Sequence, residues 1–508
     1  MDVRHKFLES LDKWGDEETI LDEGRRYSAS QLARVTVWMR NRLRAEDDSE
    51  TGNVAILLPT CAAFIPAFYG SIFAGKIPVP INPTVPAAEL AWMLDHIGAR
   101  IVLTAAPLRP VVEALPASGA QGVRAMYLDE ELGQLGFGAK LAMALQCRPS
   151  KLKAALREPP NETACMLFSS GTTGKPKAVM LSHAALIANH EAIRLRYDFG
   201  PRDTVLCALP LFHSFGLCVF HLAFWSGARI AMHRKFQPRA VLRDIQNEGV
   251  TIMLVVPQIY QMLLRNADMA KTDWSRMRLC LSGGGPAAAA LREDFERATG
   301  KRYHQGYGLT EYSPVVALET PDRAREGSVG PLLPGVEACI LDSSGKTLPL
   351  GQDGEICVRG PSAMSGYYKQ PEATRAMIDA EGWIHTGDCG HLDSDGFLYV
   401  SGRAKDIIIV AGENVHPLEI EEALLAHPDV AEAAVIGVPD ATHGEAPYAY
   451  VVSAPDSALD EKILKAHLRD RLAPYKIPKG FSIVGELPKN ALGKILKTNL
   501  KALWEQSV

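Results

Sequence analysis

The densest group of residues that could do chemistry is a short segment rich in hydroxyls, glycines and lysines. It reads Ser-Ser-Gly-Thr-Thr-Gly-Lys-Pro-Lys over residues 169–177, with an apolar run on each side. Glycines let the backbone approach an anion, hydroxyls donate hydrogen bonds, and lysines supply positive charge. Gly171 and Gly174 are too close together for a GxxxxGK[ST] loop. The segment therefore predicts a phosphate loop of another type, with a polar hairpin turn as the alternative.

Further motifs follow a set order along the chain: IPVPINP (77–83), LPLFH (209–213), GYGLTE (306–311), TGD (386–388), GRAKD (402–406), GENVHP (412–417) and PKNALGK (488–494). Taken singly, a Thr-Glu pair is usual in a surface turn, and a lysine near a chain end is usually solvated. Together with 169–177, the motifs closely resemble the signatures of the adenylate-forming superfamily. This superfamily includes acyl-CoA synthetases, aryl-CoA ligases, beetle luciferases and non-ribosomal adenylation domains. The resemblance covers the chain from about residue 50 onward, and Ala178 departs from the family's usual glycine.

The resemblance implies an ATP-dependent acid–thiol ligase. In such enzymes the acid attacks the α-phosphorus of ATP, pyrophosphate leaves, and an acyl-adenylate forms. A thiol, usually that of CoA, then displaces AMP. The expected partners are therefore a small carboxylic acid, ATP, CoA and Mg²⁺, and an acyl carrier protein stays open as the acceptor. A luciferase-like oxygenase also stays open, whereas a non-catalytic relative would be expected to have lost Lys494, Glu311 or Asp388.

The resemblance assigns the β- and γ-phosphates of ATP to the loop residues Ser169, Ser170, Gly171, Thr172, Thr173, Gly174, Lys175 and Lys177. Glu311 supplies a hard oxygen ligand for Mg²⁺, and Thr310 a hydroxyl on the α-phosphate side. Tyr307 is expected to stack on adenine, with Gly306 letting the base lie close. Asp388 and Arg403 are expected to bind the ribose hydroxyls.

Lys494 is the expected catalytic cation of adenylation. A lysine about 4 Å from a phosphate oxygen contributes about 4 kcal/mol at an effective dielectric near 20, which corresponds to roughly a thousandfold in rate. By resemblance, this lysine lies on a mobile C-terminal domain that hinges at Lys405. The segment that begins with Gly412 would face the pantetheine channel after rotation.

His213 occupies the position that resembles a gate between the carboxylate site and the thiol tunnel. We favour this role over that of a core histidine, and we assign it no general-base function. Small residues, Gly216 and 282–285 (with Gly283 also in the nucleotide-binding set), are expected to line the acyl pocket. The sequence around His213 is apolar, which favours an apolar monocarboxylic acid, and the overall resemblance favours a medium- or long-chain fatty acid. Aryl acids stay open.

The composition excludes several classes of protein. The 508 residues carry a net charge of −5, with 47% hydrophobic and 22% charged residues, which is typical of a globular protein rather than a disordered or collagen-like one. No concentrated basic segment indicates nucleic-acid binding. Nine cysteines without a CxxC pair read as reduced core residues, which predicts a cytoplasmic protein. Peripheral membrane contact and a homodimer stay open.

The predicted elements that position these residues are mixed α/β. Apolar strands are expected at 54–58, 100–104, 165–168, 178–181, 251–256 and 278–281, with helices between them. Two uncharged stretches, 54–75 and 204–228, are long enough to cross a membrane but read better as buried strand–helix units. The segment 107–160 is expected to carry irregular surface insertions. A small β-rich subdomain is expected from about residue 336, and a domain boundary divides residues 1–403 from a C-terminal α+β domain, 404–508.

Overall fold

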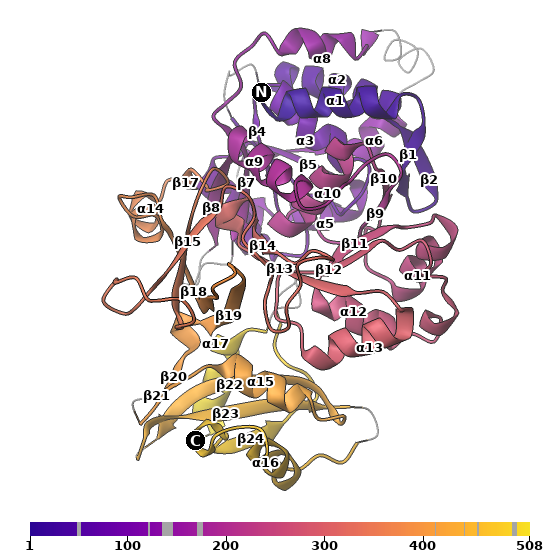
Figure 1. Cartoon of the computed structure of the whole chain (residues 1–508). Helices are drawn as coiled ribbons and strands as arrows, with labels where there is room; N and C mark the ends of the chain where they lie inside the picture. Colours follow the sequence, from indigo (N-terminus) through magenta and orange to yellow (C-terminus); the bar gives the residue numbers. More distant parts are fainter. Residues whose placement is uncertain are drawn as a thin grey trace.

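We describe a computed structural model of the chain, in which residues 1–47, 52–119, 122–134, 146–169, 176–411, 413–440, 442–454, 457–489 and 495–507 are described. The fold is mixed α/β, as predicted, with a large N-terminal domain of sheets and helices and a C-terminal domain at the opposite end from the N-terminus (Figure 1). In the described part of the chain, no helix has both the length and the apolar character needed to cross a membrane.

The largest sheet has eight strands in the order β14-β13-β12-β11-β9-β10-β1-β2. Its inner strands pair in parallel, and only the edge pairs β1–β2 and β13–β14 are antiparallel. The strands are β1 Glu18–Asp22, β2 Arg25–Ser28, β9 Thr204–Cys207, β10 Arg229–Met232, β11 Ile252–Val255, β12 Leu279–Ser282, β13 Tyr303–Gly308 and β14 Val315–Leu318. Helices that join or flank them are α9 His183–Arg194, α10 Ser214–Ser226, α11 Pro238–Asn247, α12 Pro257–Leu264 and α13 Ala289–Thr299.

A second, parallel sheet has the order β4-β3-β5-β6, with β3 Asn53–Ile56, β4 Ile77–Pro80, β5 Ile101–Thr104 and β6 Arg124–Tyr127. The N-terminal region also holds helices α1 Val3–Trp14, α2 Ala29–Glu46, α3 Phe64–Phe73, α4 Ala87–Ile97, α5 Arg109–Glu113, α6 Leu128–Gly133 and α8 Ser150–Ala155. The expectation of irregular insertions over 107–160 was therefore incomplete, because β6 completes this sheet. The sequence signal was weak there because only one of the four residues of β6, Met126, is buried.

The two uncharged stretches form a central part of the core. Helices α3 and α10 are buried along their whole length, and their aromatic side chains pack against α1. Phe7 of α1 lies 4.5 Å from Tyr69 and 5.5 Å from Phe224, measured between ring centroids. Side chains buried on every face need no charge, which explains why these stretches resemble membrane spans in sequence.

A three-stranded sheet, β17-β8-β7, carries the ends of the predicted phosphate loop. Its strands are β7 Thr163–Ser169, β8 Lys177–Ser182 and β17 Gly366–Tyr367. Strands β7 and β8 are antiparallel, and Ser169 is the register partner of Lys177. Of the seven residues between these partners, 170–175 lie outside the described residues.

The predicted β-rich subdomain is a four-stranded antiparallel sheet, β15-β16-β18-β19. Its strands are β15 Glu337–Leu341, β16 Gly354–Arg359, β18 Ile384–Leu392 and β19 Leu398–Arg403, with helix α14 Pro371–Met377 beside them. One face packs on apolar side chains that include Ile340, Ile356 and Ile384. The TGD motif lies on β18, and the GRAKD motif begins at the end of β19.

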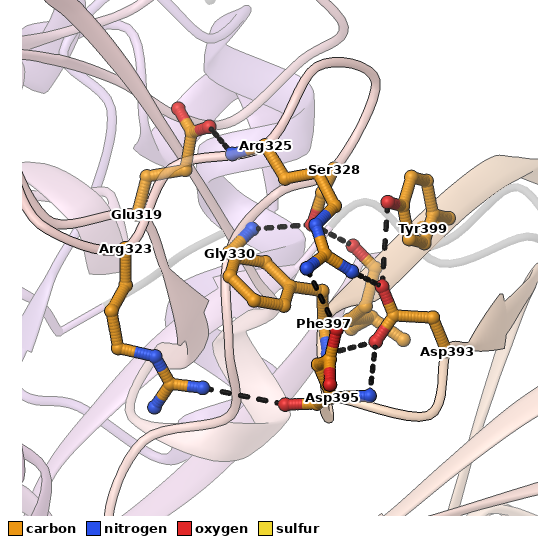
Figure 2. A network of polar contacts seen from close by, with 10 residues as sticks. Glu319, Arg323, Arg325, Ser328, Gly330, Asp393, Asp395, Phe397 and Tyr399 are labelled. Atoms are coloured by element: carbon orange, nitrogen blue, oxygen red, sulfur yellow. Dashed lines mark hydrogen bonds and ion pairs between the residues drawn. The ribbon is translucent and has the colours of Figure 1, made fainter.

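A polar network joins this subdomain to the strands that follow GYGLTE (Figure 2). Arg325 contacts the carboxylates of both Asp393 and Asp395, and its guanidinium lies 4.3 Å from the centroid of the Phe397 ring. Asp393 also accepts hydrogen bonds from the backbone N–H groups of Asp395 and Phe397, both at 2.9 Å. We call this group, together with the loop 319–330, the latch. It fixes the β18–β19 turn against the end of β14.

The C-terminal elements form a separate five-stranded sheet, β21-β20-β23-β22, with β24 paired to β23. The strands are β20 Ile408–Val410, β21 Glu413–Val415, β22 Val430–Asp440, β23 Gly444–Ser453 and β24 Gly480–Ile483, and the helices are α15 Pro417–Leu425, α16 Glu461–Arg469 and α17 Lys497–Ser507. These strands and helices give the α+β composition that the sequence predicted for the C-terminal domain. One apolar cluster packs on each face of this sheet, so the C-terminal domain has a hydrophobic core separate from that of the N-terminal domain.

Candidate active site

Glu311 lies beside the two described ends of the predicted phosphate loop. It belongs to a 3₁₀ turn, Thr310–Tyr312, directly after β13. Its Oε1 atom accepts hydrogen bonds from the hydroxyl of Ser169 at 3.1 Å and from that of Tyr367 at 2.9 Å. The ammonium of Lys177 lies 4.8 Å from the centroid of the Tyr367 ring. The structure thus brings together Ser169, Lys177 and Glu311, three of the residues assigned to the nucleotide site from the sequence.

The Glu311 carboxylate fits a hard cation. Both hydrogen bonds go to Oε1, so Oε2 has no hydrogen-bond partner among the described residues. A half-buried carboxylate oxygen with its neighbouring atom fixed by two hydroxyls is a suitable Mg²⁺ ligand. Tyr367 was missed in the sequence, since it lies 56 residues from Glu311 in a motif without an obvious chemical signature.

Thr310 is tied to the start of helix α10. Its Oγ1 atom lies 3.0 Å from the hydroxyl of Ser214, the first residue of that helix. The two hydroxyls can exchange donor and acceptor roles, so Thr310 can turn its proton toward an oxygen of a bound nucleotide. Ser214 is a second residue that the sequence reading missed.

Asp388, Arg403 and Tyr307 form one connected group. Asp388 and Arg403 are register partners on β18 and β19, and Arg403 Nε lies 2.7 Å from Asp388 Oδ1. The Tyr307 hydroxyl donates to Asp388 Oδ2 at 2.6 Å. Burial and the charge of Asp388 raise the pKa of Tyr307 well above its ordinary value, so this hydroxyl stays protonated. The two residues predicted to bind ribose therefore lie together, with Tyr307 against them.

Close packing against neighbouring residues explains why both residues next to Tyr307 are glycines. A Cβ on Gly306 would lie 2.8 Å from Leu318 Cδ1, and one on Gly308 would lie 2.1 Å from the Pro314 carbonyl oxygen. Both contacts come from the pairing of β13 with the chain segment around β14. The sequence reading explained Gly306 by access for a base, and the structure adds that any side chain there would clash with the neighbouring strand.

His213 caps helix α10. Its Nδ1 atom accepts a hydrogen bond from the Phe215 N–H at 3.3 Å, and the residue is half-buried rather than part of the core. Phe215, the next aromatic along, packs over Gly283, where a Cβ would lie 3.3 Å from the ring. His213 and the predicted acyl-pocket glycine are therefore joined through Phe215, which the sequence reading did not single out.

The predicted acyl-pocket residues divide into two kinds. A Cβ on Gly285 would meet no atom within 4 Å, and one on Gly284 would meet only Val256, at 3.5 Å, so both have room. Gly216 has no such room. A Cβ there would lie 2.1 Å from the Pro210 carbonyl oxygen, so Gly216 is needed for the close approach of α10 to the preceding turn.

The remaining predicted residues are Lys405, which the structure describes, and a set in the C-terminal domain and the phosphate loop that lies outside the described residues. Lys405 is exposed in a 3₁₀ turn, Ala404–Asp406, between β19 and β20. This turn joins the β-rich subdomain to the C-terminal sheet, which agrees with a hinge position. Lys494 and Gly412 lie outside the described residues, as do Ser170, Gly171, Thr172, Thr173, Gly174 and Lys175 of the phosphate loop.

The chain matches a known family in sequence and in structure. A family model described as AMP-binding enzyme matches residues 7–368, and one described as AMP-binding enzyme C-terminal domain matches residues 419–494. The ATP-bound crystal structure of MatB from Rhodopseudomonas palustris superposes with a TM-score of 0.88 at 30% identity, covering 99% of each chain.

Curated relatives differ in the acid and in the acceptor. The chain is 32% identical to a long-chain-fatty-acid–CoA ligase of Bacillus subtilis, over 97% of this chain and 92% of that one. It is 33% identical to ScoC of Streptomyces coeruleorubidus, a fatty acid–[acyl-carrier-protein] ligase (96% and 94%), and 34% identical to a feruloyl-CoA synthase of Amycolatopsis (93% of each). These matches extend over nearly the whole chain, which belongs to the AMP-binding enzymes and is an adenylate-forming acid–thiol ligase.

Proposed function

We propose that the protein activates an apolar monocarboxylic acid, of the medium- or long-chain fatty type, and transfers it to CoA with release of AMP and pyrophosphate. The observation that carries the choice of acid is the apolar wall beside the open glycines. The side chains placed against Gly283 and Gly284 are Phe215 and Val256, and neither can pair with a second charged group on a substrate.

The first half-reaction needs positive charge at the phosphates and a fixed nucleoside. Glu311 would hold Mg²⁺ through its open oxygen, and the ion would neutralise charge on the leaving pyrophosphate. Lys177 and the loop 170–175 would bind the terminal phosphates. Asp388 would accept from the ribose hydroxyls while Arg403 keeps its carboxylate oriented.

The second half-reaction needs a different set of groups at the same α-phosphorus. We propose that residues 1–403 form the ATP and acyl domain and that residues 404–508 rotate about Lys405. In one orientation Lys494 would stabilise the departing pyrophosphate, and in the other the segment after Gly412 would border the path of the thiol. The exposed turn at Lys405 supports this, because few contacts have to break there.

His213 is proposed as the gate between the acyl carboxylate and the thiol. His213 caps helix α10, and Phe215 in the first turn of that helix lies against Gly283 of the proposed acyl pocket. Movement of the imidazole and occupation of the pocket would therefore be coupled through Phe215. The half-buried position of His213 leaves room for such movement, which a core histidine would lack.

An acid panel tests the proposed substrate. Purified protein is incubated with ATP, Mg²⁺, CoA and equimolar octanoate, dodecanoate, hexadecanoate, 4-coumarate and ferulate, and the thioesters are identified by mass spectrometry. We expect fatty acyl-CoA to dominate. A product pool made mainly of hydroxycinnamoyl-CoA would overturn the choice of acid and establish the aryl alternative instead.

The same reaction without CoA tests the acceptor. If acyl-adenylate accumulates and is discharged by CoA, the CoA assignment holds. If it is discharged only by a phosphopantetheinylated acyl carrier protein, the carrier-protein alternative replaces it. Removal of Mg²⁺ with EDTA should stop adenylate formation in both cases, and Mg²⁺ added in excess should restore it.

A further inference from the structure

A compact group of potential metal ligands lies on the β-rich subdomain, on the face of β18 opposite Thr386 and Asp388. It comprises Glu355, Cys357 and His385, whose donor atoms all lie within 4.8 Å of one another. Glu355 and Cys357 come from β16 and His385 from the neighbouring β18, where Cys357 and His385 are register partners. It is the only such three-residue group among the residues that the structure describes.

The distances suit a single tetrahedral ion. His385 Nδ1 lies 3.5 Å from Cys357 Sγ and 3.2 Å from Glu355 Oε2. Bonds of about 2.0–2.3 Å from Zn²⁺ to nitrogen, oxygen and sulfur, set at tetrahedral angles, place neighbouring donor atoms roughly 3.3–3.6 Å apart. The two distances from the histidine nitrogen therefore match one shared ion, and the third pair, Cys357 Sγ and Glu355 Oε2, lies within 4.8 Å.

The orientation of the group is already fixed by outer contacts. Glu355 Oε1 accepts a hydrogen bond from the Gly387 N–H at 3.2 Å, which leaves Oε2 directed at the histidine. The far nitrogen of the same ring, His385 Nε2, lies 3.6 Å from Asp379 Oδ2. Asp379 is itself held, since its Oδ1 accepts from the N–H groups of Glu381 and Trp383, both at 2.9 Å. A histidine between a metal position and a carboxylate is a common arrangement in zinc sites.

A fourth potential donor lies on the neighbouring strand β15. Cys339 on β15 is the direct register partner of Cys357, and it is the only one of the nine cysteines that is not classed as buried. Cys339, Cys357 and His385 thus form one line across three strands. The Cys339 sulfur lies outside the group of donor atoms that are within 4.8 Å of one another, so its side chain has to move toward them to complete the site. Two thiolates, an imidazole and a carboxylate select Zn²⁺ over Mg²⁺ or Ca²⁺, which prefer oxygen ligands.

We propose that Cys339, Cys357, His385 and Glu355 bind one Zn²⁺ ion, with Asp379 as the outer partner of the histidine. Binding would displace the thiol protons of the two cysteines and replace the present hydrogen bonds by bonds to the ion. The ion would join β15, β16 and β18 on the outer face of their sheet.

The site lies one residue away from the TGD motif but on the other face of β18. Thr386 and Asp388 alternate with His385 and Gly387 along the strand and are buried, whereas His385 is partly exposed. Thr386 Oγ1 donates to the Ile356 carbonyl oxygen at 2.6 Å, so both faces of β18 are tied to β16. Zinc would strengthen this tie and stiffen the strand that presents Asp388.

Titration with Zn²⁺ and Co²⁺ in the absence of ATP tests the site independently of the proposed function. Metal-free protein is dialysed against each ion in excess Mg²⁺, and bound metal is counted by elemental analysis. We expect one Zn²⁺ per chain, a thiolate-to-cobalt charge-transfer band in the Co²⁺ spectrum, and a rise in the thermal unfolding midpoint that saturates at one equivalent.

Matched variants locate the ion. His385→Asn should remove stoichiometric binding and the charge-transfer band. Asp379→Asn should weaken affinity about 10- to 100-fold, as loss of an outer-shell partner does. His391→Asn is the control, because His391 lies on the same strand and pairs with a carboxylate, Asp353, at 2.7 Å without a cysteine in the group.

The unfolding midpoints of the metal-free variants show whether each one folds. If the wild-type chain binds no Zn²⁺, or if His385→Asn and His391→Asn bind it equally, the proposal is overturned. Persistence of the cobalt band in folded His385→Asn protein would have the same meaning, because the thiolates would then act without the histidine.

Discussion

The latch and the nucleotide-facing group use the same kinds of side chain to different ends. In the latch, Arg325 lies between two aspartates and over an aromatic ring, so the charges are paired within the protein (Figure 2). In the nucleotide-facing group, Glu311 is held by two hydroxyls on one oxygen, and no cation contacts it among the described residues. A closed network holds elements together, whereas an open one is oriented but incomplete.

The difference indicates which of the two groups stabilises the fold and which one gains free energy when a ligand binds. Paired surface charges add little to stability, and buried ones mainly fix geometry. An oriented carboxylate that lacks a cation gains most when a cation arrives with a ligand. The latch therefore sets the position of β18 and β19. We propose that the charge that completes the site comes from Mg²⁺, the phosphate loop and the C-terminal domain.

The largest effect should follow from removing the charge supplied by the C-terminal domain. We expect Lys494→Ala to slow ATP–pyrophosphate exchange roughly a thousandfold, because a cation near the reacting oxygens contributes about 4 kcal/mol. Thioester formation from supplied acyl-adenylate should be nearly unchanged. Equal loss in the two half-reactions would show that the lysine has a different role. Lys497→Ala, in the helix that follows, is the control.

The closed network should respond in stability instead of rate. Glu319 is fully buried and lies 2.6 Å from the guanidinium of Arg292, and it also accepts from the N–H groups of Gln305 and Arg325. Its removal in Glu319→Ala leaves the partly buried guanidinium of Arg292 and two backbone N–H groups without their acceptor, which costs about 3 kcal/mol of unfolding free energy. Denaturant titration measures this. The KM for ATP at low temperature should stay within about twofold, and a large rise in KM would erase the distinction between the two regions.

Much of the nucleotide-facing group (Ser169, Lys177, Glu311, Asp388 and Arg403) could be predicted because its residues belong to motifs that resemble those of a known family. Ser169 and Lys177 also stand where two apolar strands meet the loop, whereas the pairing of Asp388 with Arg403 across β18 and β19 is seen only in the structure. The helix–strand pattern of the C-terminal sheet was equally clear. In these regions the period of the apolar residues and the position of the polar motif agree.

Other features could not be predicted because they depend on long-range contacts. Tyr367 reaches Glu311 only after β17 pairs with β8, and a single Gly-Tyr pair carries no signal of that pairing. Gly216 was assigned to the acyl pocket by its neighbours in sequence, and its close approach to the carbonyl of Pro210 is seen only in the structure. The row of metal-ligating residues was also invisible, since its three strands are joined by long loops.

Removing the open oxygen of Glu311 should give the next largest effect. Glu311→Gln keeps a carbonyl that can accept from Ser169 and Tyr367 but loses the charge for Mg²⁺. We expect adenylation to slow about a hundredfold, with the loss in kcat at saturating ATP and Mg²⁺. Stopped-flow measurement of pyrophosphate release reports this rate. A change confined to the unfolding midpoint would assign Glu311 to structure and would place it with the latch.

Asp388 should show an intermediate effect that falls on binding. Asp388→Asn removes the partner of Arg403 and weakens acceptance from the ribose hydroxyls. Hydrogen bonds to a charged group contribute about 1.5–3 kcal/mol, so the KM for ATP should rise roughly 10- to 100-fold with a smaller change in kcat. The matched comparison uses 2′-deoxy-ATP. If the wild-type enzyme discriminates against the deoxynucleotide and Asp388→Asn does not, the carboxylate contacts the 2′-hydroxyl. Equal discrimination by both would remove it from the ribose site.

The smallest effect should come from the hydroxyl that orients Glu311. Tyr367→Phe deletes one hydrogen bond to Oε1 and leaves the ring in place beneath Lys177. A net loss of about 1 kcal/mol corresponds to roughly a fivefold decrease in the rate of adenylation. Because the hydroxyl orients the carboxylate and does not carry the charge, the loss should depend on Mg²⁺ concentration and shrink when the ion is saturating. The same fivefold decrease at all Mg²⁺ concentrations would mean that the Tyr367 hydroxyl contacts the nucleotide directly. Tyr367 would then be a binding residue in its own right, in addition to its hydrogen bond to Glu311.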